Sequence, residues 1–149
     1  MKVVAFLQNQ WVRDPERLRA MIERDGEAFR RKFLKYALFA GCLTGRRIKA
    51  AFGELCDQIV WEEVTRQIGA YAGSAFEPDL EHCRAVLRFE APNIVITFGR
   101  VAADALHQIK DCGEFYLLEL PHPADRRGNT IARLHVGAGI LHDLLGRRT

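Results

Sequence analysis

Residues 91–99 read APNIVITFG, and this stretch decides the fold class that we expect. Pro92 and Asn93 are turn-forming residues, five apolar or β-branched residues follow them, and Gly99 closes the stretch. A short run of this kind is typical of a buried strand in a parallel sheet that helices cover on both sides. The sequence that follows, RVAADALHQI, carries small residues on one helical face. Residues 91–109 therefore predict one strand-to-helix unit of an α/β fold.

The rest of the chain repeats this alternation. Asp14 and Pro15 suit the N-cap and first position of a helix, and Gly26 is a candidate break within it. In the segment AGCLTGRRIKAAFG, Thr44 is a candidate cap of a short helix and Gly53 a candidate end. The apolar pattern predicts strands over residues 2–7, 58–64, 91–99 and 114–120, and helices over 15–39, 44–53, 78–89, 100–109 and 130–145. We expect an α/β fold of three layers, α/β/α, with a four-stranded parallel sheet in a single domain over residues 1–149.

Composition and cysteine spacing narrow the class of protein. The chain has 149 residues, of which 48% are hydrophobic, and no apolar run approaches the roughly 20 residues that cross a bilayer. The N-terminus lacks the layout of a signal peptide, so a cytoplasmic location and no membrane partner are expected. None of the four cysteines forms a C-x-x-C pair, which favours reduced thiols over a metal site. We expect neither a metal nor a cofactor.

Charge is unevenly distributed along the chain. The formal net charge is only +3, but residues 28–50 carry seven basic residues and no acid, whereas residues 51–98 carry eight acids and three bases. Such segregation favours a basic face that contacts a polyanion such as a nucleic acid. The alternative is that these charges are ordinary solvated faces of helices.

Hydrogen-bonding side chains follow the first expected strand. Gln8, Asn9 and Gln10 come directly after Leu7, and Trp11 follows them. Because the carboxyl ends of parallel strands meet at one edge of a sheet, these residues should lie near the loops that follow the other strands, over residues 62–69 and 121–129. A side-chain amide offers a donor and an acceptor in one plane, which suits the edge of a planar heterocycle. We therefore expect the site at this edge.

Three stretches in this order, FLQNQW, PNIVITFGRVAADAL and LELPHPADRRG, resemble the motifs of the uracil-DNA glycosylase superfamily. The resemblance places Asn9 on the family's catalytic asparagine, and His122 and Pro123 on its second motif, after the last strand. The family's first motif has a glycine and a proline where this chain has other residues. The base-recognising asparagine after the second strand is also missing, and Glu62 and Glu63 occupy that region.

The resemblance implies a DNA glycosylase-like protein that binds single- or double-stranded DNA and flips an altered base out of the stack or excises it by hydrolysis of the N-glycosidic bond. Asn9 would position the water, and His122 would donate a hydrogen bond to the departing base. We expect a monomer. The base would contact Gln8, Gln10, Trp11, Glu62 and Glu63, and the DNA phosphates would contact Arg46, Arg47, Arg126 and Arg127.

Other interpretations stay open at this point. Glu62 or Glu63 could accept hydrogen bonds from an amino group, which would favour a cytosine-, adenine- or guanine-like edge or a modified base over uracil, or both could merely flank the site. The protein could also be a non-catalytic relative that binds nucleic acid or a nucleotide. A third alternative is a small α/β enzyme acting on a free nucleotide or sugar phosphate, with a phosphate at the helix start near Thr44, Gly45 and Arg46. No phosphate-loop, dinucleotide-binding or serine-hydrolase motif is present.

Overall fold

A four-stranded parallel sheet forms the centre of the molecule, as the sequence predicts. The structure is a computed structural model and describes residues 1–146, so the last three residues of the expected domain lie outside it. The spatial order of the strands is β3-β1-β5-β6. Their bounds are Val3–Leu7 for β1, Ile59–Glu63 for β3, Ile94–Phe98 for β5 and Tyr116–Leu120 for β6.

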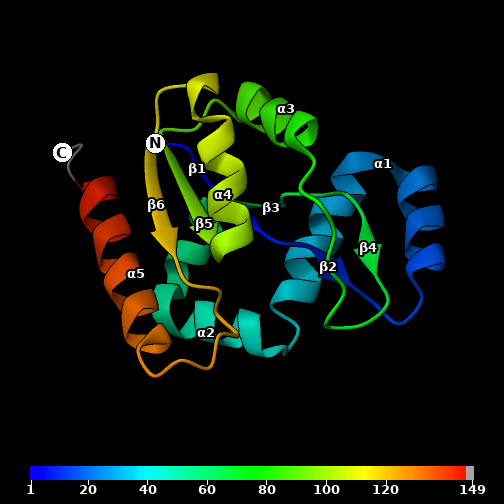
Figure 1. The fold of residues 1–149 in the computed structure, drawn as a ribbon, viewed down its shortest axis with the longest axis horizontal. Helices are drawn as coiled ribbons and strands as arrows, with labels where there is room; N and C mark the ends of the chain where they lie inside the picture. The colour runs from blue at the N-terminus through cyan, green and yellow to red at the C-terminus, as the bar shows by residue number, and fades with distance from the viewer. Residues whose placement is uncertain (147–149) are drawn as a thin grey trace.

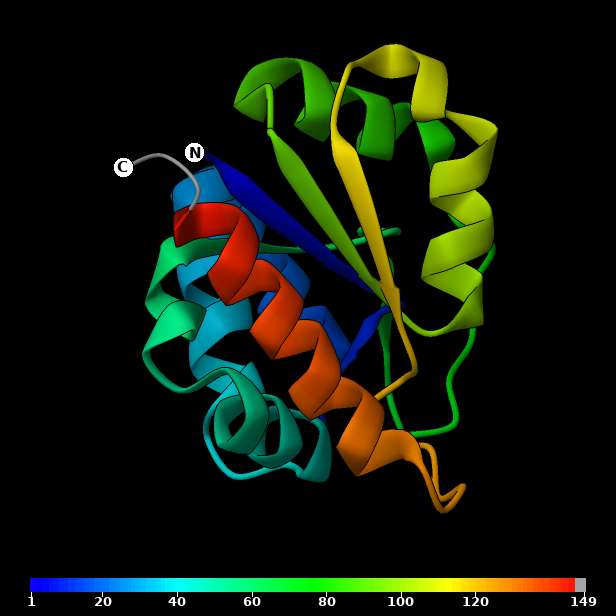
Figure 2. The same ribbon diagram turned by 90° about the vertical axis from the view of Figure 1, so that its left-hand side faces the viewer.

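Helices cover both faces of this sheet, which gives the expected three layers (Figure 2). Along β1, Val3, Ala5 and Leu7 belong to one apolar core, and Val4 and Phe6 belong to the other, as the two-residue period of a strand requires. The first core contains residues of α1 (Pro15–Leu38), α2 (Leu43–Phe52) and α5 (Thr130–Gly146), and the second contains residues of α3 (Leu80–Glu90) and α4 (Arg100–Gln108).

The strand register aligns the carboxyl ends of the sheet. Leu7 at the end of β1 pairs with Glu63 at the end of β3, and Phe98 at the end of β5 pairs with Leu120 at the end of β6. After β1 the chain enters the layer of α1 and α2, and after β5 it enters the opposite layer with α4. The connections therefore diverge between the carboxyl ends of the adjacent strands β1 and β5. Open α/β sheets form their binding crevices at such a point.

A second, two-stranded sheet was not predicted. The strands β2 (Gln10–Trp11) and β4 (Ile68–Gly69) pair in parallel and lie beside α1 (Figure 1). Two residues are too few to carry a periodic pattern, so the sequence marks both segments only as loop. Short 3₁₀ helices, η1 and η2, cover Gly53–Gln58 and Lys110–Cys112.

The helix ends agree with the sequence except at the starts of α2 and α3. Pro78 was the expected start of α3, but that helix begins at Leu80, because the Asp79 side chain caps it by accepting the backbone N–H of His82 at 3.0 Å. The Asp14 side chain accepts the backbone N–H of Arg17, and Gly26 interrupts α1 with a φ of 85°. Thr44 was the expected cap of α2, but this expectation is wrong, because α2 already begins at Leu43 and the Cys42 sulfur accepts the N–H of Gly45 at 3.4 Å. The N–H of Gly45, one of those that a phosphate at this helix start could use, therefore already has a partner.

Within residues 1–146, no helix is both long and apolar enough to cross a membrane. The four cysteines of this part of the chain are free thiols. Among the same residues, no three histidine, cysteine, aspartate or glutamate side chains are grouped closely enough to hold a metal ion.

Candidate functional site

A cavity of about 730 Å³ lies at the carboxyl edge of the sheet. Its wall is formed by the segment after β1, the C-terminal part of α1, the start of α2, the end of β3, the loop over residues 72–75 and the loop between β6 and α5. Its volume is in the range of small-molecule sites. Six of the residues expected at the site line this cavity: Gln8, Asn9, Gln10, Trp11, Glu63 and His122.

The amides after β1 offer hydrogen-bonding groups on the cavity wall. The Asn9 side chain donates through Nδ2 to the carbonyl of Gln10 at 3.3 Å, which leaves its Oδ1 as an acceptor. The Nε2 of Gln10 is buried and has no hydrogen-bond partner in the described part of the chain. A buried donor without a partner costs about 1–3 kcal/mol, so an acceptor on a bound ligand would recover part of this energy.

Trp11 lies at the rim of the cavity. It belongs to β2, where it pairs with Gly69, and the next residue, Val12, donates its N–H to the Gly69 carbonyl at 2.9 Å. Trp11 is 47% exposed, whereas Trp61 is a core residue whose ring stacks on Phe98. Trp11 is thus a partly solvated ring fixed by strand pairing, and such a ring can stack on a planar ligand.

The environment of His122 selects one tautomer of its ring. Nδ1 accepts the backbone N–H of Ala124 at 3.1 Å, so a neutral ring carries its proton on Nε2. Burial lowers the pKa of His122 from its ordinary value, and Asp125 opposes this shift. The ring therefore favours the neutral form, with Nε2–H as a hydrogen-bond donor.

Gly99, at the turn from β5 to α4, allows the His122 loop to approach closely. Its φ is 95°, a conformation that side chains other than glycine rarely adopt. A Cβ atom at this position would lie only 3.1 Å from the Cβ of His122. Gly99 also donates its N–H to the carbonyl of Leu120 at 2.8 Å, so this turn lies directly against the end of β6.

Glu62 does not line the cavity, because the alternation of β3 turns it into a buried ionic cluster. Its side chain is 0% exposed and accepts a hydrogen bond from Arg30 at 2.8 Å, with Arg31 at 3.6 Å and His82 at 3.4 Å. Burial alone would raise the pKa of Glu62, but hydrogen bonds from His82 and Arg30 lower that pKa to about 2. Glu62 therefore stays ionised and joins β3 to α1 and α3.

Glu63, the neighbouring residue, has the opposite environment. Its side chain lines the cavity, is 5% exposed, and makes no hydrogen bond or ion pair with any residue from 1 to 146. Burial, followed by the negative charge of Glu62, raises the pKa of Glu63 to about 8, although Arg30 acts in the other direction. Glu63 is therefore predominantly a neutral carboxylic acid near neutral pH.

The four arginines expected at DNA phosphates differ in their surroundings. Arg47 donates through Nη1 to the carbonyls of Pro123 at 2.8 Å and Asp125 at 3.0 Å, so it fixes the loop that carries His122. Arg127 is exposed and pairs with Asp125 at 3.2 Å. Arg46 and Arg126 are exposed and form no ion pair within the described residues.

The basic segment over residues 28–50 is partly neutralised within the fold. Arg30 pairs with Glu27 and Glu62, and Arg31 pairs with Glu90 at 2.7 Å. These two arginines therefore contribute less to a basic surface than the sequence suggests. Of the segment's remaining cations, Lys35 pairs with Asp57, and Arg47 binds the loop carbonyls. The other three are Lys32, Arg46 and Lys49.

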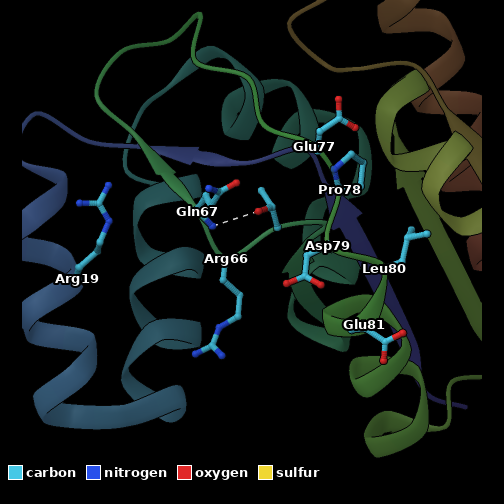
Figure 3. Close-up of a pocket in the computed structure, with 9 residues that line it drawn as sticks. Arg19, Arg66, Gln67, Glu77, Pro78, Asp79, Leu80 and Glu81 are labelled. Carbon is cyan, nitrogen blue, oxygen red and sulfur yellow. Dashed lines mark hydrogen bonds between the residues drawn. The ribbon is translucent and has the colours of Figure 1, made fainter.

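Two further hollows contain different chemistry. One, of about 590 Å³, lies between α1, the segment over residues 65–67 and the start of α3, and Figure 3 shows Arg19 and Arg66 across from Glu77, Asp79 and Glu81. The other, of about 800 Å³, lies over α1 and α2, and Arg46 is the one predicted site residue on its wall. Neither collects the amides, Trp11 or His122, so we place the candidate site in the cavity at the sheet edge, which we call the edge cavity.

Sequence reasoning missed part of the wall of the edge cavity. Leu34 and Leu38 of α1 carry only the apolar signal of a core helix, and their side chains are largely buried. Cys42 and Ser74 lie in connecting segments with no pattern that would distinguish them. Comparisons with protein-family models, with curated proteins and with solved structures found no match for the chain.

Proposed function

We propose that the protein is a DNA glycosylase-like protein that binds DNA, takes an altered base into the edge cavity, and excises it by hydrolysis of the N-glycosidic bond. The observation that supports this proposal is the meeting of Asn9, Trp11 and His122 on one cavity wall, although more than a hundred residues separate the first from the last. The chain's resemblance to the uracil-DNA glycosylase superfamily adds to it.

Each of these groups has a role in such a reaction. Trp11 stacks on the face of the extruded base, an interaction worth about 1–3 kcal/mol. The Asn9 Oδ1 accepts a hydrogen bond from the attacking water and so orients it. As the bond between the sugar and the base breaks, its electron pair goes to the base, and the Nε2–H of His122 stabilises the developing charge. Water supplies the hydroxyl of the abasic sugar and the proton of the released base.

The second candidate function is binding of a base without its excision. Glu63 is the one carboxyl on the wall that the described residues form, and its raised pKa of about 8 makes it a poor general base near neutral pH. An amide cannot replace a general base. This observation favours a protein that extrudes and holds a base but releases it slowly or not at all.

Assays on oligonucleotides carrying a panel of deaminated, methylated and oxidised bases test the first candidate. Abasic sites, detected by alkaline strand cleavage, should form in at least one substrate. His122→Ala should slow their formation by about 10²–10³-fold, as removal of an oxyanion-type donor does. His135→Ala is the matched control, because His135 is exposed on α5 and does not line the edge cavity.

The same panel separates the two candidates. If the wild-type protein produces no abasic site in any substrate, catalysis is excluded. The second candidate then requires tighter binding to a duplex with a mismatched or altered base than to the matched duplex. It also requires that Trp11→Ala removes this preference. Equal affinity for all duplexes would exclude both candidates.

A further inference from the structure

The carboxyl group of Glu63 is placed as a contact for a ligand. It lies at the last position of β3, and within the described chain no other acidic side chain lines the edge cavity. It is almost wholly buried, yet it has no hydrogen-bond partner among residues 1–146. Buried polar groups normally have a partner, and the exceptions often mark functional sites.

The titratable groups around Glu63 leave it without a counter-ion. On β3, Glu62 adds negative charge, and Arg30 of α1 binds Glu62 at 2.8 Å. From α3, His82 approaches the backbone carbonyl of Glu63 through Nε2 at 3.1 Å.

The remaining groups on the cavity wall do not change this balance. The ring of His122 favours the neutral form, and its Nδ1 binds Ala124. Between α1 and α2, the Cys42 thiol donates to the carbonyl of Leu38 at 3.3 Å. No cationic side chain lines the edge cavity within the described residues.

We propose that Glu63 is the residue of the edge cavity that determines base specificity, and that its carboxyl group pairs with a base edge carrying one donor beside one acceptor. Its hydroxyl donates to the acceptor and its carbonyl oxygen accepts from the donor. Cytosine and adenine offer such an edge as a ring nitrogen beside an amino group, and uracil offers it as N3–H beside O4. This inference rests on the proposed function only in that the cavity takes a nucleobase.

An ionised Glu63 would select differently. A carboxylate has only acceptors, so it would pair with two adjacent donors, as on guanine, and would repel both phosphate and the negative charge of a departing base. The neutral acid removes this repulsion. Ionisation of Glu63 should therefore weaken the binding of a donor–acceptor edge.

Binding of methylated free bases tests this inference without DNA. The probes are 1-methylcytosine and 1-methyluracil, which keep the donor–acceptor edge, and 1,3-dimethyluracil, in which a methyl group replaces the donor. Titrations followed by NMR should show that the wild-type protein binds the first two about tenfold more tightly, as two hydrogen bonds allow. Affinity for 1-methylcytosine should fall as the pH rises through about 8.

Glu63→Gln is the informative variant, because its amide keeps one donor and one acceptor but does not titrate in this range. It should bind 1-methylcytosine with nearly wild-type affinity and without the pH dependence. Glu63→Leu should lose about tenfold in affinity. Glu114→Gln, at an exposed position before β6, should change neither quantity.

Several results would overturn the inference. The first is that the wild-type protein does not prefer 1-methylcytosine and 1-methyluracil over 1,3-dimethyluracil, which includes the case that it binds none of them. The second is an affinity for 1-methylcytosine that stays constant or rises with pH. The third is loss of binding in Glu63→Gln. The proposed function fails separately. If the bases bind as described but no altered duplex is cleaved or preferred, the specificity role of Glu63 stands and the action on DNA does not.

Discussion

At position 63, the protein holds a carboxyl group in an environment that suits its protonated form. The pKa of Glu63 is raised from 4.5 to about 8, so between these values the folded chain binds a proton that the unfolded chain has released. For a pKa raised on folding, the stabilisation is fully present below the unfolded value and is lost as the pH rises through the folded value. Glu63 therefore makes the folded state progressively less stable from about pH 4.5 to about pH 8.

Glu63→Gln should remove this pH-dependent loss of folding stability, because the glutamine side chain does not titrate in this range. We expect the free energy of unfolding near neutral pH to rise by about 1–3 kcal/mol over the wild-type value. The difference should disappear near pH 4, where the wild-type glutamate is protonated in both states. Urea denaturation at several pH values measures it, with Glu114→Gln as the control. A variant less stable than wild type at neutral pH would contradict the shifted pKa.

Gly99 provides a second test at the scale of one residue. An alanine there would have to adopt a φ of 95° and would place its Cβ 3.1 Å from the Cβ of His122. Gly99→Ala should cost about 1–3 kcal/mol of stability and displace the His122 ring. The NMR signals of that ring and its pKa should both shift.

Gly26→Ala is a matched control for this substitution. Gly26 has a similar backbone conformation, with a φ of 85°, but nothing lies within 4 Å of the Cβ that an alanine would add. Gly26→Ala should lower the free energy of unfolding by a similar amount through backbone strain and leave the His122 ring unchanged. Equal shifts of His122 in both variants would show that Gly99 has no special role in placing it.

The sequence predicted that several of the polar side chains now seen on the wall of the edge cavity would lie close together, but it could not separate Glu62 from Glu63. The amides and His122 follow strands that the apolar pattern marks clearly, so their meeting at one edge follows from the parallel topology. The two glutamates necessarily face opposite sides of β3. The packing position of α1 decides which glutamate meets Arg30 and which one faces the cavity. No local sequence pattern encodes this packing position.

At the scale of the secondary-structure elements, Arg47 of α2 is hydrogen-bonded to the loop between β6 and α5. Arg47→Ala removes two hydrogen bonds to the carbonyls of Pro123 and Asp125. We expect a loss of about 2 kcal/mol in the free energy of unfolding and a more mobile His122 loop, visible as faster amide exchange over residues 122–128.

Arg46→Ala is the neighbouring control. Arg46 is exposed and forms no ion pair within residues 1–146, so its removal should change stability by less than about 0.5 kcal/mol. If both variants are equally stable and equally weakened in DNA binding, Arg47 contacts phosphate rather than the loop.

The strands and helices of the main fold could be predicted from the sequence, because each is long enough to show a repeating pattern of apolar residues. The exceptions are small. The pairing of β2 with β4 involves two residues on each side, and Cys42 rather than Thr44 caps α2 because the chain enters that helix two residues before the expected cap. Both details depend on contacts between segments distant in sequence or on the path of a turn.

Taken as a whole molecule, the protein has less free basic surface than its sequence suggests. Arg30 and Arg31 lie in the ionic cluster with Glu62 and Glu90, which no count of charges along the chain can anticipate. The three-layer architecture was predictable from the order of the elements, whereas the distribution of charge between interior and surface was not.

The proposed binding of DNA predicts an affinity that depends on salt mainly through the exposed arginines near the edge cavity. The double variant Arg126→Ser and Arg127→Ser should bind duplex DNA more weakly. Its slope of log K against log salt should be smaller by up to about 2, since each neutralised phosphate contributes roughly 0.9. Fluorescence anisotropy at several salt concentrations measures the slope. An unchanged slope would place the DNA on another face, and Arg133→Ser, on the exposed side of α5, is the control.

The alternation of Glu62 and Glu63 along β3 also separates two tasks that a single carboxylate could not combine. One residue anchors helices to the sheet, and its neighbour faces the cavity with no structural duty. If Glu63 has the proposed specificity role, exchange of the side chain at 63 would change which ligand is preferred and leave the ion pair of Glu62 with Arg30 in place.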